Sequence, residues 1–235
     1  MLALGVGGYA AARTTAAFDV TSIEVRGAPA PVAADVRDAL GPLVGTSLLD
    51  VSSTDVGGRL EALPFVASAN HDRAFPHTLV VVVRPERPVA ILRRGRDSWL
   101  LAESGRVLES VSRGARARLP RIWVPASVDV TIGSVVSGSA AARAARALRP
   151  VSSTTFPARI STVRAGEDEL TFLLASGLEI RLSDETNLPL KLGVASQIVP
   201  LLPAHLLGGP AYLDLSVPER PVAGTTLDSQ LEVDG

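Results

Sequence analysis

The chain has 235 residues, of which 46% are hydrophobic, and a formal net charge of −1. This length and composition predict a folded protein of one large or two small domains, and they exclude an intrinsically disordered chain. The nearly balanced charge gives no argument for binding nucleic acid. The absence of cysteine excludes disulfides, thiolate zinc sites and cysteine nucleophiles.

The first residues form an uncharged apolar run, residues 2–12, which Arg13 ends. The run is shorter than the roughly 20 apolar residues of a spanning helix, and it lacks the basic flank that begins a signal peptide. We interpret residues 1–17 as part of a membrane anchor and its linker, with the anchor beginning upstream of Met1. The alternative is a short apolar terminus that packs on the domain or frays.

The next part predicts a small module in the order strand, helix, helix, strand, strand. Residues 18–27 alternate apolar and polar side chains, which indicates a strand. Pro31 opens a helix, and a second helix with a serine or threonine cap ends before Pro64. Strands follow at residues 65–73 and 78–86. The second of these is a continuous apolar run, so we expect it to be central and buried on both faces.

The remaining residues predict a second α+β domain with a mainly antiparallel sheet. Short strands surround the turns "RGRDS" and "ESG", an alanine-rich helix begins at Ser139, and three strands from residue 158 form a meander. A helix around Lys191 and a final strand, "AYLDLSV", complete the domain. The predicted parts are residues 1–17 (anchor and linker), 18–86 (first module), 87–223 (second domain) and 224–235 (polar tail).

The motifs of both domains resemble a known family. A first strand with "I-E-V-R-G", a second entered by "L-P-F-V", and "R-A-F-P-H-T-L-V-V-V-V-R-P-E-R-P-V-A" over the third are similar to a polypeptide-transport-associated (POTRA) domain. The "E-R-P-V-A" exit, "S-G-L-E-I-R-L-S-D … L-P-L-K-L" and the final "A-Y-L-D-L-S-V-P-E-R-P-V-A" resemble the bacterial cell-division family FtsQ/DivIB. The resemblance covers about residues 18–223. Lys191 is the only lysine, which indicates the codon bias of a high-GC genome, as in a high-GC Gram-positive bacterium.

The resemblance implies a non-enzymatic divisome scaffold with a single membrane span and extracytoplasmic domains, placed at the division septum. It implies FtsB- and FtsL-like partners on the second domain, other division proteins on the POTRA-like module, and no nucleic acid. Two alternatives stay open at this point. One is a POTRA-containing export or envelope-assembly factor, although the chain neither repeats the module nor continues into a barrel. The other is an exported cell-wall enzyme.

The final strand is the predicted partner-binding site. It ends the domain, so we expect it at a sheet edge, where a partner strand can add through backbone hydrogen bonds. The resemblance implies the same role for Tyr212, but no basic residue precedes Arg220 on this strand to pair with an acidic partner. The alternative is an ordinary edge strand packed on the core. The predicted site residues are Tyr212, Leu213, Asp214, Leu215, Ser216 and Val217.

Residues for catalysis, metal binding or cofactor binding are not evident in the sequence, so we expect no catalytic residue, metal or cofactor. His71 and His77 flank a hairpin turn and can approach one another, but a metal needs further ligands. The acidic "GEDE" at residues 166–169 indicates a tight turn more than a calcium loop. Residues 113–121 contain four arginines, which indicate a solvated loop or a contact with anionic lipid or wall polymer.

The hexapeptide "PERPVA" occurs twice, at residues 85–90 and 218–223. The flanking sequences do not match, so the repeat does not indicate a duplicated domain. Each copy follows an apolar strand, and its two prolines remove backbone donors. We interpret the first copy as the hinge between the domains and the second as the point where the tail leaves the sheet.

Overall fold

The computed structural model describes residues 16–116, 118–136, 139–153, 156–166, 169–203, 206 and 211–225. The chain divides into two compact units, residues 1–87 and 88–235. Each unit has a hydrophobic core of its own. Among the described residues, no helix has both the length and the apolar character needed to cross a membrane.

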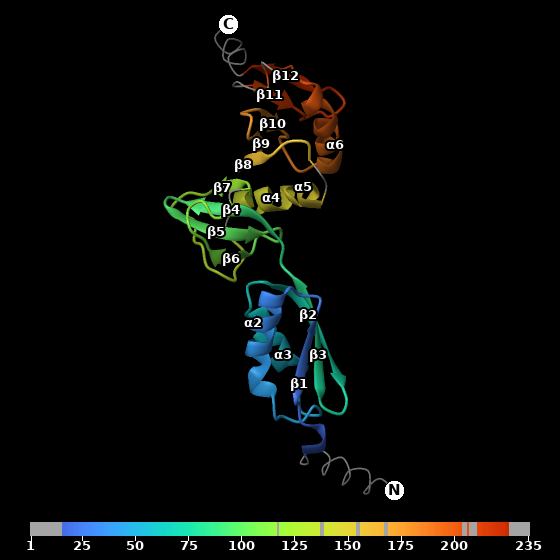
Figure 1. The fold of residues 1–235 in the computed structure, drawn as a ribbon. Helices are drawn as coiled ribbons and strands as arrows, with labels where there is room; N and C mark the ends of the chain where they lie inside the picture. The colour runs from blue at the N-terminus through green and yellow to red at the C-terminus, as the bar shows by residue number, and fades with distance from the viewer. Residues whose placement is uncertain are drawn as a thin grey trace. The chain divides into compact units, whose positions relative to one another are not determined.

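The N-terminal unit is the predicted βααββ module (Figure 1). Its three strands pair in the order β1-β3-β2, with β1 parallel and β2 antiparallel to β3. Both helices lie on one face of this sheet. The elements are η1 (Ala16–Phe18), β1 (Ser22–Arg26), α2 (Ala30–Leu40), η2 (Gly41–Leu43), α3 (Ser53–Glu61), β2 (Val66–Ala74) and β3 (Thr78–Pro85).

Local sequence explains where these helices begin. A proline occupies the first turn of α2, where its missing N–H costs no helical hydrogen bond. The side chain of Ser52 caps α3 by accepting a hydrogen bond from the Thr54 N–H at 3.2 Å. The helices bury their apolar faces against Leu79 and Val81 of β3, among other side chains of the same core.

The strand β3 is central, as predicted, but it is not buried on both faces. Leu79, Val81 and Val83 face the helices and are at most 3% exposed, whereas Val82 on the opposite face is 49% exposed. The reason is that α2 and α3 cover one face of the sheet only. The continuous apolar run therefore predicted the central position of β3 correctly. It predicted the burial of the strand's side chains only in part.

The C-terminal unit contains a nine-stranded sheet among its described residues, in the order β12-β11-β10-β9-β8-β7-β4-β5-β6. Five of the eight pairings are antiparallel, so the predicted α+β class with a mainly antiparallel sheet is confirmed. The strands are β4 (Pro88–Arg94), β5 (Asp97–Ala102), β6 (Val107–Ser110), β7 (Arg121–Trp123), β8 (Ile160–Ala165), β9 (Leu170–Leu174), β10 (Glu179–Arg181), β11 (Ala211–Asp214) and β12 (Val222–Thr225).

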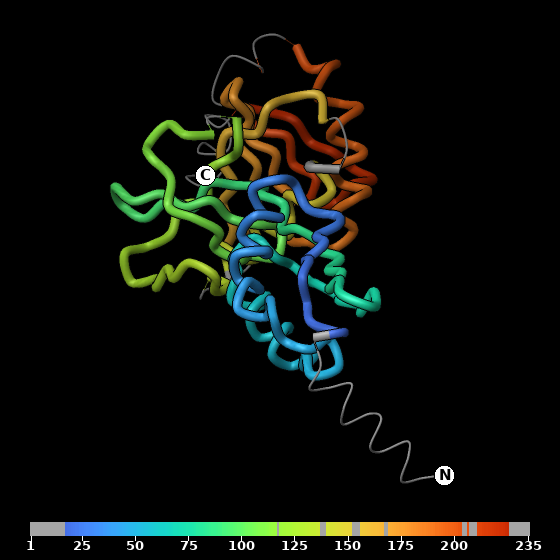
Figure 2. The backbone as a smooth tube through the Cα atoms, turned by 60° about the horizontal axis from the view of Figure 1, so that its bottom comes forward, coloured from blue at the N-terminus to red at the C-terminus, as the bar shows by residue number. Residues whose placement is uncertain are grey.

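The helices of this unit cover one face of the sheet. They are α4 (Ser139–Ala147), α5 (Arg149–Ser153), α6 (Leu188–Ile198) and the short η3 (Val199–Leu201). The alanines of α4 pack against β4, β7 and β8, and Leu192 of α6 joins the same core as Phe172 and Leu213. Figure 2 shows β8 to β12, coloured from gold through orange to red, running side by side. The opposite face, called the open face below, carries mostly polar side chains on β8 to β11, whereas on β4 and β5 it also contains the buried Ile91 and Leu100.

Candidate functional site

The predicted binding strand is shorter than expected and does not lie at the edge. The strand β11 ends at Asp214, and β12 pairs with it antiparallel from Ala211↔Thr225 to Asp214↔Val222. On its other side β11 pairs with β10 in parallel. The prediction that residues 211–217 form the last, edge strand is therefore wrong, and in the described part of the sheet the edge belongs to β12. Gly224 and Thr225, predicted as the start of the tail, are part of that strand.

The second "PERPVA" explains the difference. Arg220 N–H donates to the Val217 carbonyl at 3.0 Å, which closes a turn and sends the chain back along β11. The last residues of the motif then begin β12, so the motif joins two strands of one sheet. The first copy joins the end of β3, in the sheet of the N-terminal unit, to the start of β4, in the sheet of the C-terminal unit. Both copies are strand connections, and the second is not the exit of a tail.

Ala223 presents its backbone to the open edge of the sheet. Leu215 N–H donates to the Arg181 carbonyl at 2.8 Å, so the odd-numbered residues of β11 direct their backbone groups toward β10. The backbone N–H and C=O groups of Tyr212 and Asp214 therefore point toward β12, where these residues lie opposite Gly224 and Val222. Because backbone directions alternate along a strand, the N–H and C=O of Ala223 point away from β11. A partner strand could bond to these groups.

Tyr212 lies on the open face, held between two neighbouring strands. The guanidinium of Arg181 on β10 lies 4.2 Å from the centre of its ring. On the other side, a Cβ atom at Gly224 would come within 3.0 Å of the tyrosine hydroxyl. The predicted site residues thus separate by face, since Leu213 and Leu215 are buried in the core while Tyr212 and Asp214 are half-buried on the open face. Val217 is 54% exposed in the turn.

Charged side chains continue this surface across the sheet. Arg164 of β8 and Arg181 of β10 both form ion pairs with Glu179, which lies opposite Tyr212 in the strand register. A hollow of about 350 Å³ lies beside them. It is lined by Arg164, Glu169, Leu170, Thr171, Glu179, Arg181, Ser183, Asp214 and Ser216. Sequence reasoning missed Arg164 and Arg181, because the contact of Arg181 with Tyr212 and of Arg164 with Glu179 depends on the order of the strands.

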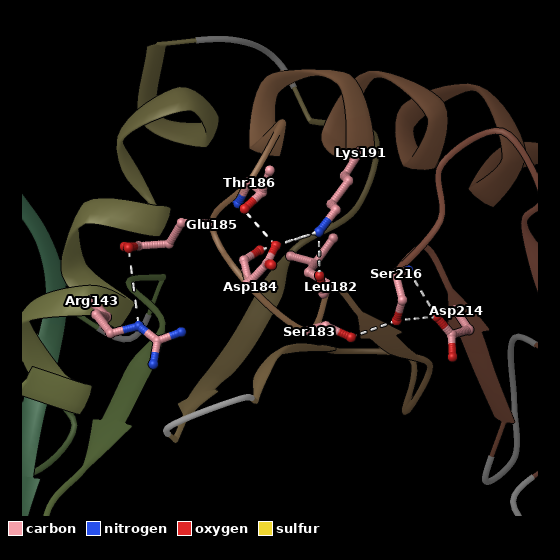
Figure 3. A network of polar contacts seen from close by, with 9 residues as sticks. All are labelled: Arg143, Leu182, Ser183, Asp184, Glu185, Thr186, Lys191, Asp214 and Ser216. Carbon is pink, nitrogen blue, oxygen red and sulfur yellow. Dashed lines mark hydrogen bonds and ion pairs between the residues drawn. The ribbon is translucent and has the colours of Figure 1, made fainter.

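A network of polar contacts holds the end of β11 against the segment that follows β10 (Figure 3). Ser216 Oγ–H donates to Asp214 Oδ1 at 2.6 Å, and the Ser216 N–H donates to the same oxygen at 2.8 Å. Ser216 Oγ also lies 2.6 Å from Ser183 Oγ, which connects the turn after β11 to the segment after β10. These contacts give Ser216 a structural role in the turn after β11. Ser216 is not part of the edge strand β12.

Lys191 holds the same segment from the helix side. Its side chain is buried, and its Nζ donates to the Leu182 carbonyl at 2.6 Å and to Asp184 Oδ1 at 2.8 Å. The hydrogen bond from Lys191 holds the pKa of the Asp184 carboxyl below its ordinary value, and the Thr186 N–H adds to the effect. Lys191, which the sequence analysis used only as a sign of codon bias, thus connects α6 to the segment that follows β10.

The other residues singled out from the sequence do not assemble into a reactive site. His71 Nε2 lies 3.3 Å from Ser53 Oγ, and His77 Nδ1 lies 3.1 Å from the Asp19 carbonyl, so each histidine has its own partner. Gly166 N–H donates to the Glu169 carbonyl at 2.7 Å in the turn between β8 and β9. No group of three or more metal-ligating side chains occurs within the described ranges. The third histidine of the chain, His205, lies outside them.

The chain is similar to the structure of the major extracytoplasmic domain of the trans isomer of the cell-division protein DivIB from Geobacillus stearothermophilus. The identity is 19%, the match covers 50% of this chain and 93% of the other, and the TM-score is 0.33. No curated protein matches the chain.

Two family models match, one in each unit. The model of the FtsQ-type POTRA domain matches residues 18–84. The model of the C-terminal part of the cell-division protein FtsQ/DivIB matches residues 90–216, which is more than half of the chain. The chain therefore belongs to the FtsQ/DivIB family of bacterial cell-division proteins.

Proposed function

We propose that the chain is a non-enzymatic scaffold of the division complex, anchored in the cell membrane by its N-terminal region, with both units outside the membrane at the septum. The family membership supports the role in division. The FtsQ-type POTRA unit makes contacts with other division proteins in this proposal. The match of the C-terminal unit to a cell-division model favours this role over an export factor.

The C-terminal unit binds FtsB- and FtsL-type partners by adding a partner strand to β12. The observation that carries this proposal is the open edge at Ala223, whose backbone N–H and C=O point away from β11. The strand "VAGT" carries no charge, and the proline nearest to it, Pro221, lies just before it. Proteins usually protect an exposed edge with charge or proline within the strand, so an unprotected edge suits a site that receives a partner.

The open face beside the edge suits an acidic partner segment. The predicted strand lacks a basic residue, but Arg181 on the adjoining strand β10 lies against the Tyr212 ring, and Arg164 on β8 pairs with Glu179, the register partner of Tyr212. Arg164 keeps about half of its side chain exposed despite its ion pair with Glu179. Acidic side chains next to the added strand would meet these two arginines, while Tyr212 offers an aromatic surface.

The decisive experiment removes one backbone donor. Ala223→Pro deletes the N–H that points to the partner, and an edge position tolerates proline in the folded chain. We expect the affinity for the extracytoplasmic segment of the FtsB-type partner to fall about tenfold. Ala223→Val is the matched control, because it keeps the N–H and should bind normally.

Binding is measured by titration calorimetry and folding by circular dichroism. If a folded Ala223→Pro variant binds as tightly as Ala223→Val, strand addition at β12 is wrong. The scaffold role has a separate test. A fluorescent fusion of the full protein should form a band at mid-cell, and a uniform envelope signal would contradict the role in division.

A further inference from the structure

Two buried polar atoms without a partner lie next to each other at the other end of the sheet. Arg93 on β4 and Ser98 on β5 are opposite residues in the strand register. Their exposed fractions are 9% and 5%. Neither Arg93 Nε nor Ser98 Oγ has a hydrogen-bond partner among the described residues. Buried polar atoms nearly always find partners, so two unsatisfied donors on opposite residues of one face are an unusual feature that calls for an explanation.

Two further arginines lie close to this pair. Arg121 is two residues before Trp123 on β7, and Trp123 is the register partner of Arg93, so Arg93 and Arg121 share the open face. Arg113 lies in the connection between β6 and β7. Burial lowers the pKa of the Arg93 guanidinium, and the charges of Arg121 and Arg113 lower it further. Within the described residues, none of the three arginines forms an ion pair with a carboxylate.

An aromatic ring completes the site. Trp123 is 54% exposed, and the Arg93 guanidinium lies 5.6 Å from the centre of the ring. The guanidinium therefore has the tryptophan on one side and Ser98 across the strand. Such an arrangement fixes the direction of the Arg93 donors, whereas an ordinary surface arginine moves freely. Fixed guanidinium forks are suited to the oxygen atoms of phosphate and carboxylate groups.

We propose that Arg93, Ser98, Arg113 and Arg121 form a binding site for a phosphate group, with Trp123 as its wall. Three guanidinium charges without a carboxylate match a dianion better than a single carboxylate. A hydroxyl donor beside the fork suits a tetrahedral group with several acceptor oxygens. The site is independent of the strand edge at β12, because it lies on β4, β5 and β7, on the other side of β8 to β10 in the strand order.

The test follows the indole N–H signals of the two tryptophans by nuclear magnetic resonance in the full chain. Inorganic phosphate is added at low, constant ionic strength, with acetate as the carboxylate control. We expect a saturable shift of the Trp123 signal with phosphate and a weaker response to acetate. Trp99 is the internal control, because it faces the helix side of the sheet. If Trp123 does not respond, or responds equally to acetate, the proposal is wrong.

Variants identify the residues. Arg121→Gln should weaken phosphate binding about tenfold, whereas Arg116→Gln, an exposed arginine of the same connection, should leave it unchanged. Ser98→Ala should weaken binding and at the same time raise the melting temperature of the free protein, since it removes a buried hydroxyl without a partner. Equal binding by Arg121→Gln and Arg116→Gln, or by Ser98→Ala and the unmodified chain, would overturn the assignment.

The source of the phosphate group is distinguished by flotation with vesicles. Phosphatidylglycerol vesicles are compared with phosphatidylcholine vesicles, using the full chain and Arg121→Gln. Loss of flotation with phosphatidylglycerol in Arg121→Gln assigns the site to a lipid headgroup. Flotation unaffected by Arg121→Gln, together with saturable binding of inorganic phosphate, assigns it to a soluble phosphate ester.

Discussion

The ring of Tyr212 on β11 lies over Gly224 on β12, so closely that a Cβ atom at position 224 would be 3.0 Å from the hydroxyl and 3.1 Å from Cζ. The two residues are also register partners. Any side chain at position 224 would therefore require the Tyr212 ring to shift by a few tenths of an ångström, whereas the backbone angles of Gly224 do not themselves demand glycine. The position of the Tyr212 ring therefore depends on the residue at position 224 of the edge strand.

Gly224→Val tests this dependence. The valine side chain would push the Tyr212 ring away from Gly224 and from the Arg181 guanidinium, which costs both strain and the cation–π contact. We expect the free energy of unfolding of the C-terminal unit to fall by about 1 kcal/mol. Both tryptophans lie in this unit, so the fluorescence of a denaturant titration reports its unfolding alone.

Ala223→Val is the matched control for this substitution. It introduces the same side chain on the same strand at an exposed position, so it measures the β propensity of valine without the clash. The two valine variants should differ clearly, with Gly224→Val the less stable. Equal stabilities would mean that the ring moves aside without cost and that Gly224 does not hold Tyr212.

Lys191 provides a second prediction, because its buried ammonium connects α6 to the segment after β10. Lys191→Met keeps most of the length and packing of the side chain and removes the donors to the Leu182 carbonyl and to Asp184. We expect a loss of about 1–3 kcal/mol in the tryptophan-detected unfolding free energy. Asp184→Asn should cost less, because the carboxyl side chain is 54% exposed and an amide oxygen still accepts the bond. If both variants lost the same unfolding free energy, the stabilising contact of Lys191 would be the one with Asp184 and not the one with the buried Leu182 carbonyl.

The lowered pKa of Asp184 predicts a dependence of stability on pH. Because the folded state binds this proton less tightly than the unfolded state, the contribution is complete above the ordinary aspartate pKa of about 3.9. It is lost as the pH falls through the lower, folded-state value. We expect the unmodified chain to lose more stability than Asp184→Asn between pH 5 and the acid limit, in the same tryptophan-detected titration. Parallel curves for the two proteins would show that Lys191 does not lower this pKa.

The sequence predicted the elements that have strong local signals. The βααββ module follows from alternation, caps and prolines, and the β8–β10 meander follows from three apolar strands with clear turns. The strand β12 has no such signal, because "VAGT" contains glycine and has little alternation of apolar and polar residues. The strand forms because it pairs with β11, and the local sequence does not indicate this pairing. The two prolines of "PERP" were the one local sign that the chain reverses direction before β12.

The candidate site shows the same limit. Tyr212 was identified from its resemblance to a family position, and the structure places it on the open face. Arg181 reaches Glu179 as a neighbour on the same strand, whereas only the pairing of β8, β9 and β10 brings the distant Arg164 to the same carboxylate. Spacing in the sequence therefore did not indicate the charge beside Tyr212. The orphaned atoms of Arg93 and Ser98 likewise depend on the register of β4 and β5.

The charge beside the edge leads to the last prediction, which concerns the rate of association. In the proposed complex, Arg164 attracts an acidic partner segment, and such attraction acts mainly on the association rate and weakens with salt. Arg164→Glu should lower that rate about tenfold at low ionic strength and reduce its salt dependence. Arg96→Glu is the matched control, since it makes the same change of charge at an exposed turn. Stopped-flow mixing with the FtsB-type segment measures both variants. If Arg96→Glu slows association as much as Arg164→Glu, the effect belongs to the net charge of the unit and not to this surface.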